Sequence, residues 1–180
     1  MEIDRDEKVK KKYKIFIDEL QNIEQDIRNI SHKLSENFDS KKVSFIKIIR
    51  QLVEDKGRLG SFKHELNSDK KINWQKINEK VKINLYRITQ EALQNIIKYA
   101  SAKNVTVEFS LADLDYLIVN IKDDGIGFQK NKKGSGIGMK NITTRVKRLK
   151  GSVTINSKIN QGTSLKIQIP IQLTDGKQKT

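Results

Sequence analysis

The sequence of 180 residues has no cysteine and a single proline, and it holds no apolar run of about 18 residues. Without cysteine, the chain forms neither a disulfide framework nor a thiolate metal site nor a cysteine nucleophile. The missing apolar run predicts no membrane-spanning helix, and the charged residues 1–14 lack the apolar core of a signal peptide. We therefore expect a cytoplasmic location, although the chain could be part of a larger membrane-anchored protein.

Acidic residues are also scarce relative to basic ones. The 36 Lys and Arg exceed the 22 Asp and Glu, which gives a formal net charge of +14. Such a surplus fits a nucleic acid, an acidic protein or a polyphosphate ligand. The lysines are spread from end to end, however, and we find neither a helix-turn-helix signature nor a Cys/His finger. A solvated lysine-rich surface is the favoured interpretation, and nucleic-acid binding is not expected.

The length predicts one domain with a short appendage. Residues 5–38 are expected to form a long helix, because apolar residues recur at alternating steps of four and three. These are Val9, Tyr13, Phe16, Leu20, Ile23, Ile27, Ile30 and Leu34. One regular seam needs a second helix to bury it, and the simplest partner is a second copy of the chain. We therefore predict a coiled-coil homodimer through residues 9–34.

The rest of the chain predicts an α+β domain. Amphipathic helices are expected at 43–56, where Gly57 and Gly60 would close the helix, and from about 74 or 77 to 100. The apolar period then changes to two, which indicates strands paired as hairpins. The expected strands are 61–67, 105–111, 117–121, 152–158 and 164–173, with a further helix at 139–149.

Three polar residues of the helix ending near residue 100 share one face. Glu91, Asn95 and Lys98 stand at positions i, i+4 and i+7. A carboxylate, an amide oxygen and an ammonium group in one place suit a phosphate bridged by Mg²⁺. An ordinary solvated helix face is the alternative interpretation.

Two glycine-rich stretches offer backbone sites. In residues 122–128, Asp123 at a strand end can accept a hydrogen bond from an exocyclic amine, while Gly125 and Gly127 let the backbone approach a flat ring. An ordinary turn would look the same. Residues 134–138, GSGIG, open onto a helix and could bind an anion, although they match neither common phosphate-binding fingerprint. Thr163 follows Gly162 at the start of the last strand, where its hydroxyl could reach a phosphate or a ring nitrogen.

The order and spacing of these segments resemble the four ATP-binding boxes of sensor histidine kinases. The segments are LYRITQEALQNIIKYA (85–100), DDGIGF (123–128), GSGIGMKNITTRV (134–146) and QGTSLKIQIP (161–170). Their residues are most similar to those of the subfamily that pairs with helix-turn-helix response regulators. The resemblance covers residues 43–172. It implies a two-layer α/β sandwich of the Bergerat type, with a mixed sheet and helices on one face. It also divides the chain into a dimerisation and phosphoacceptor helix (1–42), an ATP-binding catalytic domain (43–172) and a frayed tail (173–180).

The resemblance implies a role for each residue singled out above. Asn95 would bind Mg²⁺, Glu91 would aid phosphoryl transfer and Lys98 would contact phosphate. Asp123 would accept the adenine amino group, and Thr163 would complete the adenine end. Gly125 and Gly127 would lie under the adenine ring. The hinges of a lid over the triphosphate would be Gly134, Gly136 and Gly138. The lid, residues 128–138, carries Lys130, Lys132 and Lys133.

The phosphoacceptor implied by the resemblance is His32, which the heptad places on the solvent side of the helix. A neutral imidazole nitrogen there could attack the γ-phosphate. Two departures weaken the match. Lys33 occupies the place where the family has an acid, although Glu36 could substitute for it. The spacer of residues 33–44 is also too short for the family's usual second long helix.

These observations predict the catalytic portion of a histidine kinase. It would use Mg-ATP, phosphorylate His32 and pass the phosphoryl group to an aspartate of a response regulator. One alternative is an ATP-binding regulatory or phosphatase module with weak or no autokinase activity. Another is a related anti-sigma-type serine kinase, which the helix carrying His32 argues against.

Overall fold

The computed structural model describes residues 44–112, 115–129 and 137–171. Five strands in these ranges form one mixed sheet with the order β1-β2-β3-β5-β4. Their bounds are β1 Lys63–Ser68, β2 Asn104–Ala112, β3 Tyr116–Asp123, β4 Ser152–Ser157 and β5 Thr163–Pro170. β1 runs parallel to β2, and the other three pairs are antiparallel.

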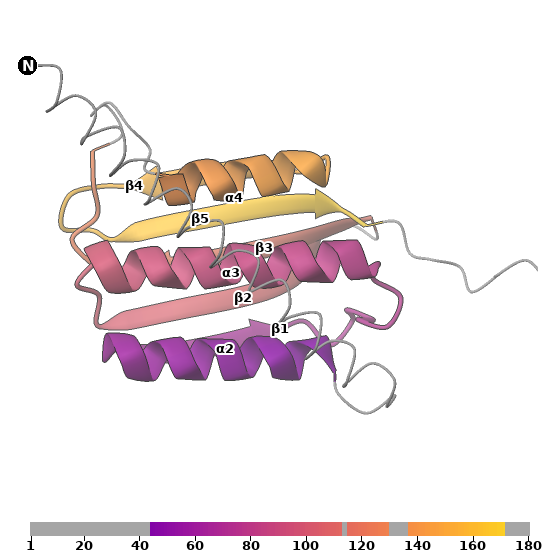
Figure 1. Ribbon diagram of the computed structural model, residues 1–180, viewed down its shortest axis with the longest axis horizontal. Helices are drawn as coiled ribbons and strands as arrows, with labels where there is room; N and C mark the ends of the chain where they lie inside the picture. The colour runs from indigo at the N-terminus through magenta and orange to yellow at the C-terminus, as the bar shows by residue number, and fades with distance from the viewer. Residues whose placement is uncertain (1–43, 113–114, 130–136, 172–180) are drawn as a thin grey trace, which may run out of the picture. The chain divides into compact units, whose positions relative to one another are not determined.

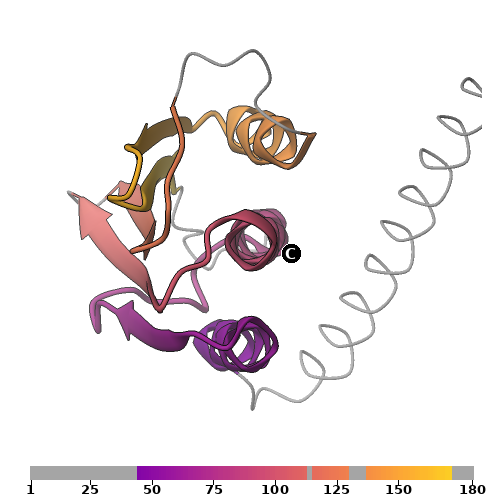
Figure 2. The same cartoon turned by 90° about the vertical axis from the view of Figure 1, so that its left-hand side faces the viewer.

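Three helices cover one face of this sheet, α2 (Phe45–Gly60), α3 (Glu79–Tyr99) and α4 (Ile137–Arg148). Figure 1 shows them side by side along the strands, and Figure 2 shows all three on the same side of the sheet. The predicted mixed sheet with helices on one face is confirmed. The predicted coiled-coil helix and frayed tail fall in 1–43 and 172–180, outside the described residues.

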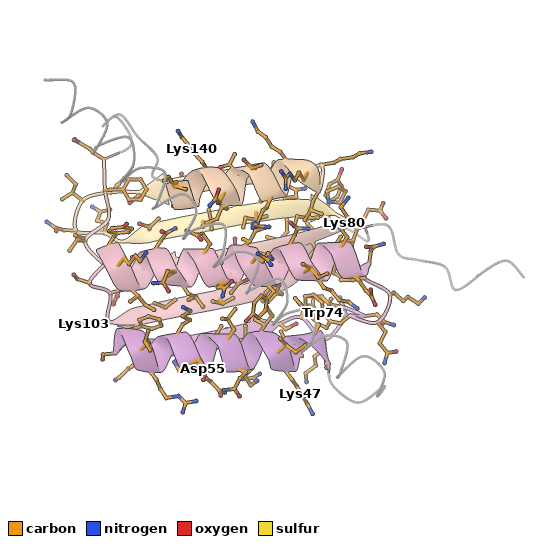
Figure 3. All side chains as sticks on the ribbon, in the orientation of Figure 1. Lys47, Asp55, Trp74, Lys80, Lys103 and Lys140 are labelled. Carbon is orange, nitrogen blue, oxygen red and sulfur yellow. The ribbon has the colours of Figure 1, made fainter. Side chains whose placement is uncertain are left out.

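The core lies between the sheet and the helices. Alternate residues of the central strands, such as Val107, Phe109, Val119 and Ile167, are buried in this core. Trp74, in the segment between β1 and α3, joins this core and lies between α2 and α3 in Figure 3. Its ring centroid is 4.8 Å from that of Phe45 and 5.4 Å from that of Phe109. These contacts fix α2 to β2 through aromatic packing.

The helix bounds differ in detail from the predicted ones. Asn78 begins α3 as its N-cap, because its side chain accepts a 2.8 Å hydrogen bond from the Lys80 N–H. α2 continues through Gly57 to Gly60, and Ser61 ends it in the left-handed conformation. The prediction that Gly57 closes α2 was wrong. Gly57 is buried in the helix because its surface packs against the His64 ring of β1.

Candidate nucleotide site

α3 and α4 meet at Glu91, Asn95 and Gly138, which we call the helix half of the site. Glu91 and Asn95 lie one turn apart on α3 and are both half-buried. A Cβ added to Gly138 would collide with Glu91 Oε1 and would lie 3.0 Å from Asn95 Oδ1 and 3.1 Å from Asn95 Nδ2. The first turn of α4 therefore rests directly on both side chains, and a glycine permits this approach.

Asn95 is less exposed than the sequence suggested. The first turn of α4 partly covers it, so it is half-buried and not part of a fully solvated helix face. Its Nδ2 atom is buried and has no hydrogen-bond partner in the described part of the chain. A buried amide without a partner is costly in an isolated domain. A half-turn about the last bond of this side chain exchanges the positions of its nitrogen and oxygen.

The donor set of the helix half fits a hard cation such as Mg²⁺ that is carried by a nucleotide. An amide oxygen and a carboxylate are suitable oxygen ligands. Among the described residues, no group of three or more His, Cys, Asp or Glu side chains could hold a metal ion. A Mg²⁺ bound at Asn95 would therefore need further ligands from phosphate and water. Lys98, which the sequence joined to this set, is exposed near the end of α3.

The second group of predicted residues lies at the carboxyl end of β3. We call Asp123, Gly125, Gly127, Gly162 and Thr163 the strand half of the site. Asp123 ends β3 and is only 5% exposed. Its carboxylate accepts a 2.9 Å hydrogen bond from the Gly125 N–H and another from the N–H of Thr163, its partner residue on β5.

Asp123 and its neighbour Asp124 have opposite electrostatic environments. Burial raises the pKa of Asp123, the Gly125 and Thr163 N–H groups lower it, and the negative charge of Asp124 raises it. Asp124 is exposed and accepts hydrogen bonds of 2.8, 2.8 and 2.7 Å from the Lys103 N–H, the Asn104 N–H and the Asn104 side chain. Hydrogen bonds from Asn104 are the main cause that lowers the pKa of Asp124. Asp124 thus ties β3 to the start of β2, while Asp123 points into the protein.

The glycines of the strand half are required by the protein's own backbone. Gly127 has a φ of +58°, and a Cβ there would collide with the Lys158 carbonyl oxygen. Gly162 has a φ of +74°, and a Cβ there would collide with the Asp123 carbonyl oxygen. The turn between β4 and β5 is therefore pressed against the segment that follows β3. This close packing leaves Asp123 little freedom to move.

One hydroxyl in this region escaped the sequence analysis. Ser157 Oγ lies 3.0 Å from Thr163 Oγ1, donates a 3.2 Å hydrogen bond to the Gly162 carbonyl and accepts a 2.8 Å bond from the Phe128 N–H. It therefore joins the segment after β3 to both strands of the last hairpin. The pairing of the predicted last hairpin could have indicated Ser157, because it is the β4 residue opposite Thr163.

Two arginines also escaped the sequence analysis. Arg87 of α3 is 6% exposed, and Arg145 of α4 is half-buried. Both belong to segments quoted for their resemblance, but the amphipathic pattern alone places neither near the site. Of the predicted residues, His32, Gly134, Gly136 and the lysines Lys130, Lys132 and Lys133 lie outside the described ranges.

The fold and these residues match a known family. A family model described as "Histidine kinase-, DNA gyrase B-, and HSP90-like ATPase" matches residues 80–173, which include every described residue of both halves. The chain belongs to this ATPase family. The predicted histidine-kinase-type ATP-binding catalytic domain is therefore confirmed at the level of the domain.

Its relatives include histidine kinases. The signal transduction histidine-protein kinase/phosphatase DegS of Bacillus subtilis is 35% identical over 121 residues, 61% of this chain and 31% of DegS. The oxygen sensor histidine kinase NreB of Staphylococcus carnosus is 34% identical over 99 residues, 54% of this chain and 28% of NreB. The chain thus spans about a third of the length of these curated relatives.

Solved structures agree on the fold. The blue-light activated histidine kinase of Erythrobacter litoralis EL346 superposes with a TM-score of 0.64 at 16% identity, over 84% of this chain and 51% of that one. The mycobacterial sensor histidine kinase MprB gives a TM-score of 0.54 at 18% identity, over 73% of this chain and 97% of that one. Within the described residues, no helix combines the length and the apolar composition needed to cross a membrane.

Proposed function

We propose that the chain is the cytoplasmic catalytic portion of a two-component sensor histidine kinase. It binds Mg-ATP, autophosphorylates His32 and transfers the phosphoryl group to an aspartate of a response regulator. The observation that carries this proposal is that the two halves lie at the same end of the domain, because Gly125 of the strand half packs against the Ala100 carbonyl oxygen at the end of α3. Glu91 and Asn95 lie under Gly138 in the helix half, and a buried carboxylate lies in the strand half.

The two halves would divide the nucleotide between them. Asp123 would accept the adenine amino group, next to Gly125, Gly127 and Thr163. Asn95 would hold Mg²⁺, and Glu91 would orient the reacting groups, while Lys98 contacts phosphate. When bound, Mg²⁺ neutralises charge on the phosphates during transfer. Gly134, Gly136 and Gly138 would belong to the segment that closes over the phosphates.

The transfer itself needs a nucleophile from residues 1–42. A neutral imidazole nitrogen of His32 would attack the γ-phosphorus, so that an N–P bond forms as the bond to the β,γ-bridging oxygen breaks and ADP leaves. The heptad seam of residues 9–34 would bring two copies together for this step. The relatives' names as histidine kinases support a response regulator as the next acceptor. This regulator would be of the helix-turn-helix class, with which the kinase subfamily that the sequence resembles is paired.

Labelling with γ-labelled Mg-ATP tests this proposal. The wild type should acquire acid-labile, alkali-stable label that His32→Gln loses, because a phosphohistidine hydrolyses in acid. Label that survives in His32→Gln would overturn the assignment of His32. Acid-stable label would instead indicate a serine kinase.

A second candidate function is an ATP-binding regulatory or phosphatase module. Lys33 favours it, because a cation next to His32 cannot take the role of the family's acid. The name of DegS as a kinase/phosphatase also supports it. Nucleotide binding without labelled protein, together with loss of phosphate from a phosphorylated regulator, would favour this function.

A further inference from the structure

Three neighbouring strands change from apolar to polar side chains at the same row of the sheet. In the last row, Ser157 of β4 lies opposite Thr163 of β5, which lies opposite Asp123 of β3, so the three side chains share one face. The inward-facing residues of the row before it belong to the core or pack against it, and they are Ile155, Leu165 and Ile121. Asp123 is only 5% exposed, so this polar row is not a solvent-exposed rim.

Ser157 has more polar contacts than a hydroxyl group can make as a donor. Its Oγ atom accepts a bond from the Phe128 N–H, donates to the Gly162 carbonyl oxygen and lies 3.0 Å from Thr163 Oγ1. A hydroxyl group carries one proton and two lone pairs. While the Ser157 proton is on the Gly162 carbonyl oxygen, the bond between the two hydroxyl groups must use the proton of Thr163.

Backbone hydrogen bonds hold these groups in place. The Ile126 N–H donates to the Ala100 carbonyl oxygen at 2.8 Å, and the Asn160 N–H donates to the Ile126 carbonyl oxygen at 2.7 Å. The segment after β3 is therefore bonded both to the end of α3 and to the turn between β4 and β5. Rotation of the Thr163 hydroxyl proton remains the easiest adjustment in this row.

This arrangement gives the polar row a single hydrogen-bonding character. A Thr163 hydroxyl that donates to Ser157 presents only lone pairs to a ligand, and an ionised Asp123 also presents only lone pairs. An amino group of a ligand can donate to such acceptors. A carbonyl oxygen in the same place would find no proton and would leave buried polar atoms unpaired, which is unfavourable.

We propose that Ser157 is a specificity-determining residue of the nucleotide site, because it binds the Thr163 proton and thereby makes the Thr163 hydroxyl an acceptor. The site then selects a purine with a 6-amino group over a purine with a 6-carbonyl group. Ser157 acts on the base only through Thr163. The inference rests on the proposed function, in which Asp123 and Thr163 meet the adenine end of ATP.

Equilibrium binding of Mg-ATP and Mg-ITP to the full chain tests this inference without any need for catalysis. ITP has a carbonyl oxygen in place of the 6-amino group and a proton on the neighbouring ring nitrogen, and it is otherwise identical to ATP. Displacement of a fluorescent ATP analogue gives both Kd values. The wild type should bind ATP at least about tenfold more tightly than ITP. Ser157→Ala should reduce this preference by about threefold to tenfold, because the Thr163 proton becomes available to the carbonyl oxygen.

Three further variants show whether the effect passes through Thr163. In a Thr163→Val background, Ser157→Ala should cause no further change in the preference, since the hydroxyl that it orients is gone. Ser157→Thr keeps a hydroxyl group and should retain most of the preference. Ser164→Ala is the matched control and should leave the preference unchanged, because Ser164 is the next residue of β5 and faces the other side of the sheet.

A purely structural role of Ser157 would weaken the binding of both nucleotides equally. An equal loss in Ser157→Ala would therefore overturn the inference, and so would an unchanged or increased preference for ATP. These results leave ATP binding by the wild type intact, so they are distinct from failure of the proposed function, in which the wild type binds neither nucleotide. If Ser157→Ala does not fold, Ser157→Cys replaces it with the same expected loss of preference, because sulfur is a weak acceptor.

Discussion

The two halves of the site are built from different parts of the polypeptide. In the strand half, backbone groups do most of the positioning, through the N–H groups on Asp123 and through glycines pressed against carbonyl oxygens. In the helix half, side chains of α3 stand against the first turn of α4, and the buried Asn95 Nδ2 atom has no hydrogen-bond partner among the described residues. The strand half is thus held mainly by backbone contacts, whereas the helix half is held mainly by side chains. Substitutions should therefore affect stability in the first half and ligand binding or catalysis in the second.

The largest expected effect on stability comes from Gly127→Ala in the strand half. Its φ of +58° strains any residue with a Cβ, and the new methyl group meets the Lys158 carbonyl oxygen, which cannot move alone. We expect the free energy of unfolding to fall by about 2–4 kcal/mol. Urea unfolding of the nucleotide-free chain measures this. Asn160→Gly, in the β4–β5 turn against which Gly127 packs and also at positive φ, should change it by less than about 1 kcal/mol. If Gly127→Ala were as stable as the wild type, the claim that the backbone of the strand half cannot accommodate a Cβ would be contradicted.

Asn95→Ala should have the largest effect on binding and little effect on folding. Loss of the proposed Mg²⁺ ligand should weaken Mg-ATP binding by at least about a hundredfold. The substitution also removes a buried amide nitrogen that has no hydrogen-bond partner in the part of the chain that the structure describes, so the free energy of unfolding should change by less than about 1 kcal/mol. Isothermal titration and urea unfolding give the two values. Gln94→Ala is the matched control, because Gln94 bonds Lys56 of α2 at 2.6 Å instead. An unchanged affinity of Asn95→Ala for Mg-ATP would contradict the assignment of Asn95 as a Mg²⁺ ligand.

Gly138→Ala makes the same glycine-to-alanine change in the helix half. Alanine favours a helix over glycine by about 0.5–1 kcal/mol, and the atom that it meets is the end of the flexible Glu91 side chain. Stability should therefore change by less than about 1 kcal/mol. Displacement of Glu91 and Asn95 should still lower the transfer rate on the order of tenfold. Thr144→Ala, exposed on α4, should change neither quantity. A loss of stability as large as that of Gly127→Ala would show that the two halves do not differ.

The same difference explains how much the sequence could predict. Local patterns were sufficient for the helices and hairpins, since burial on one face imposes the apolar period. The parallel pairing of β1 with β2 depends on a crossover through α3 and has no local signal. Asp123 and its glycines stand close together in the sequence, so their grouping was predictable. The charges of Arg87 and Glu91 act on Arg145 only because α4 packs on α3, and the same packing makes Asn95 half-buried.

The smallest expected effect is a dependence of stability on pH that has opposite signs at two adjacent carboxylates. The raised pKa of Asp123 means that the folded chain holds this proton more tightly than the unfolded chain. Its contribution is favourable below the ordinary value of 3.8 and is lost as pH rises through the folded pKa. The lowered pKa of Asp124 gives the reverse, a contribution that is present above 3.8 and is lost as pH falls through the folded pKa.

Urea unfolding between about pH 2.5 and 7 separates the two carboxylates when each is replaced by asparagine. The stability of wild type relative to Asp123→Asn should fall as pH rises above 3.8, because the buried carboxylate must ionise. Relative to Asp124→Asn, the stability of wild type should instead fall as pH drops below 3.8, where Asp124 loses the charge that its hydrogen bonds to Asn104 favour. Slopes of the same sign would mean that burial does not govern Asp123. Opposite slopes would show that the strand half holds a destabilised carboxylate, ready for the amine that we propose it binds.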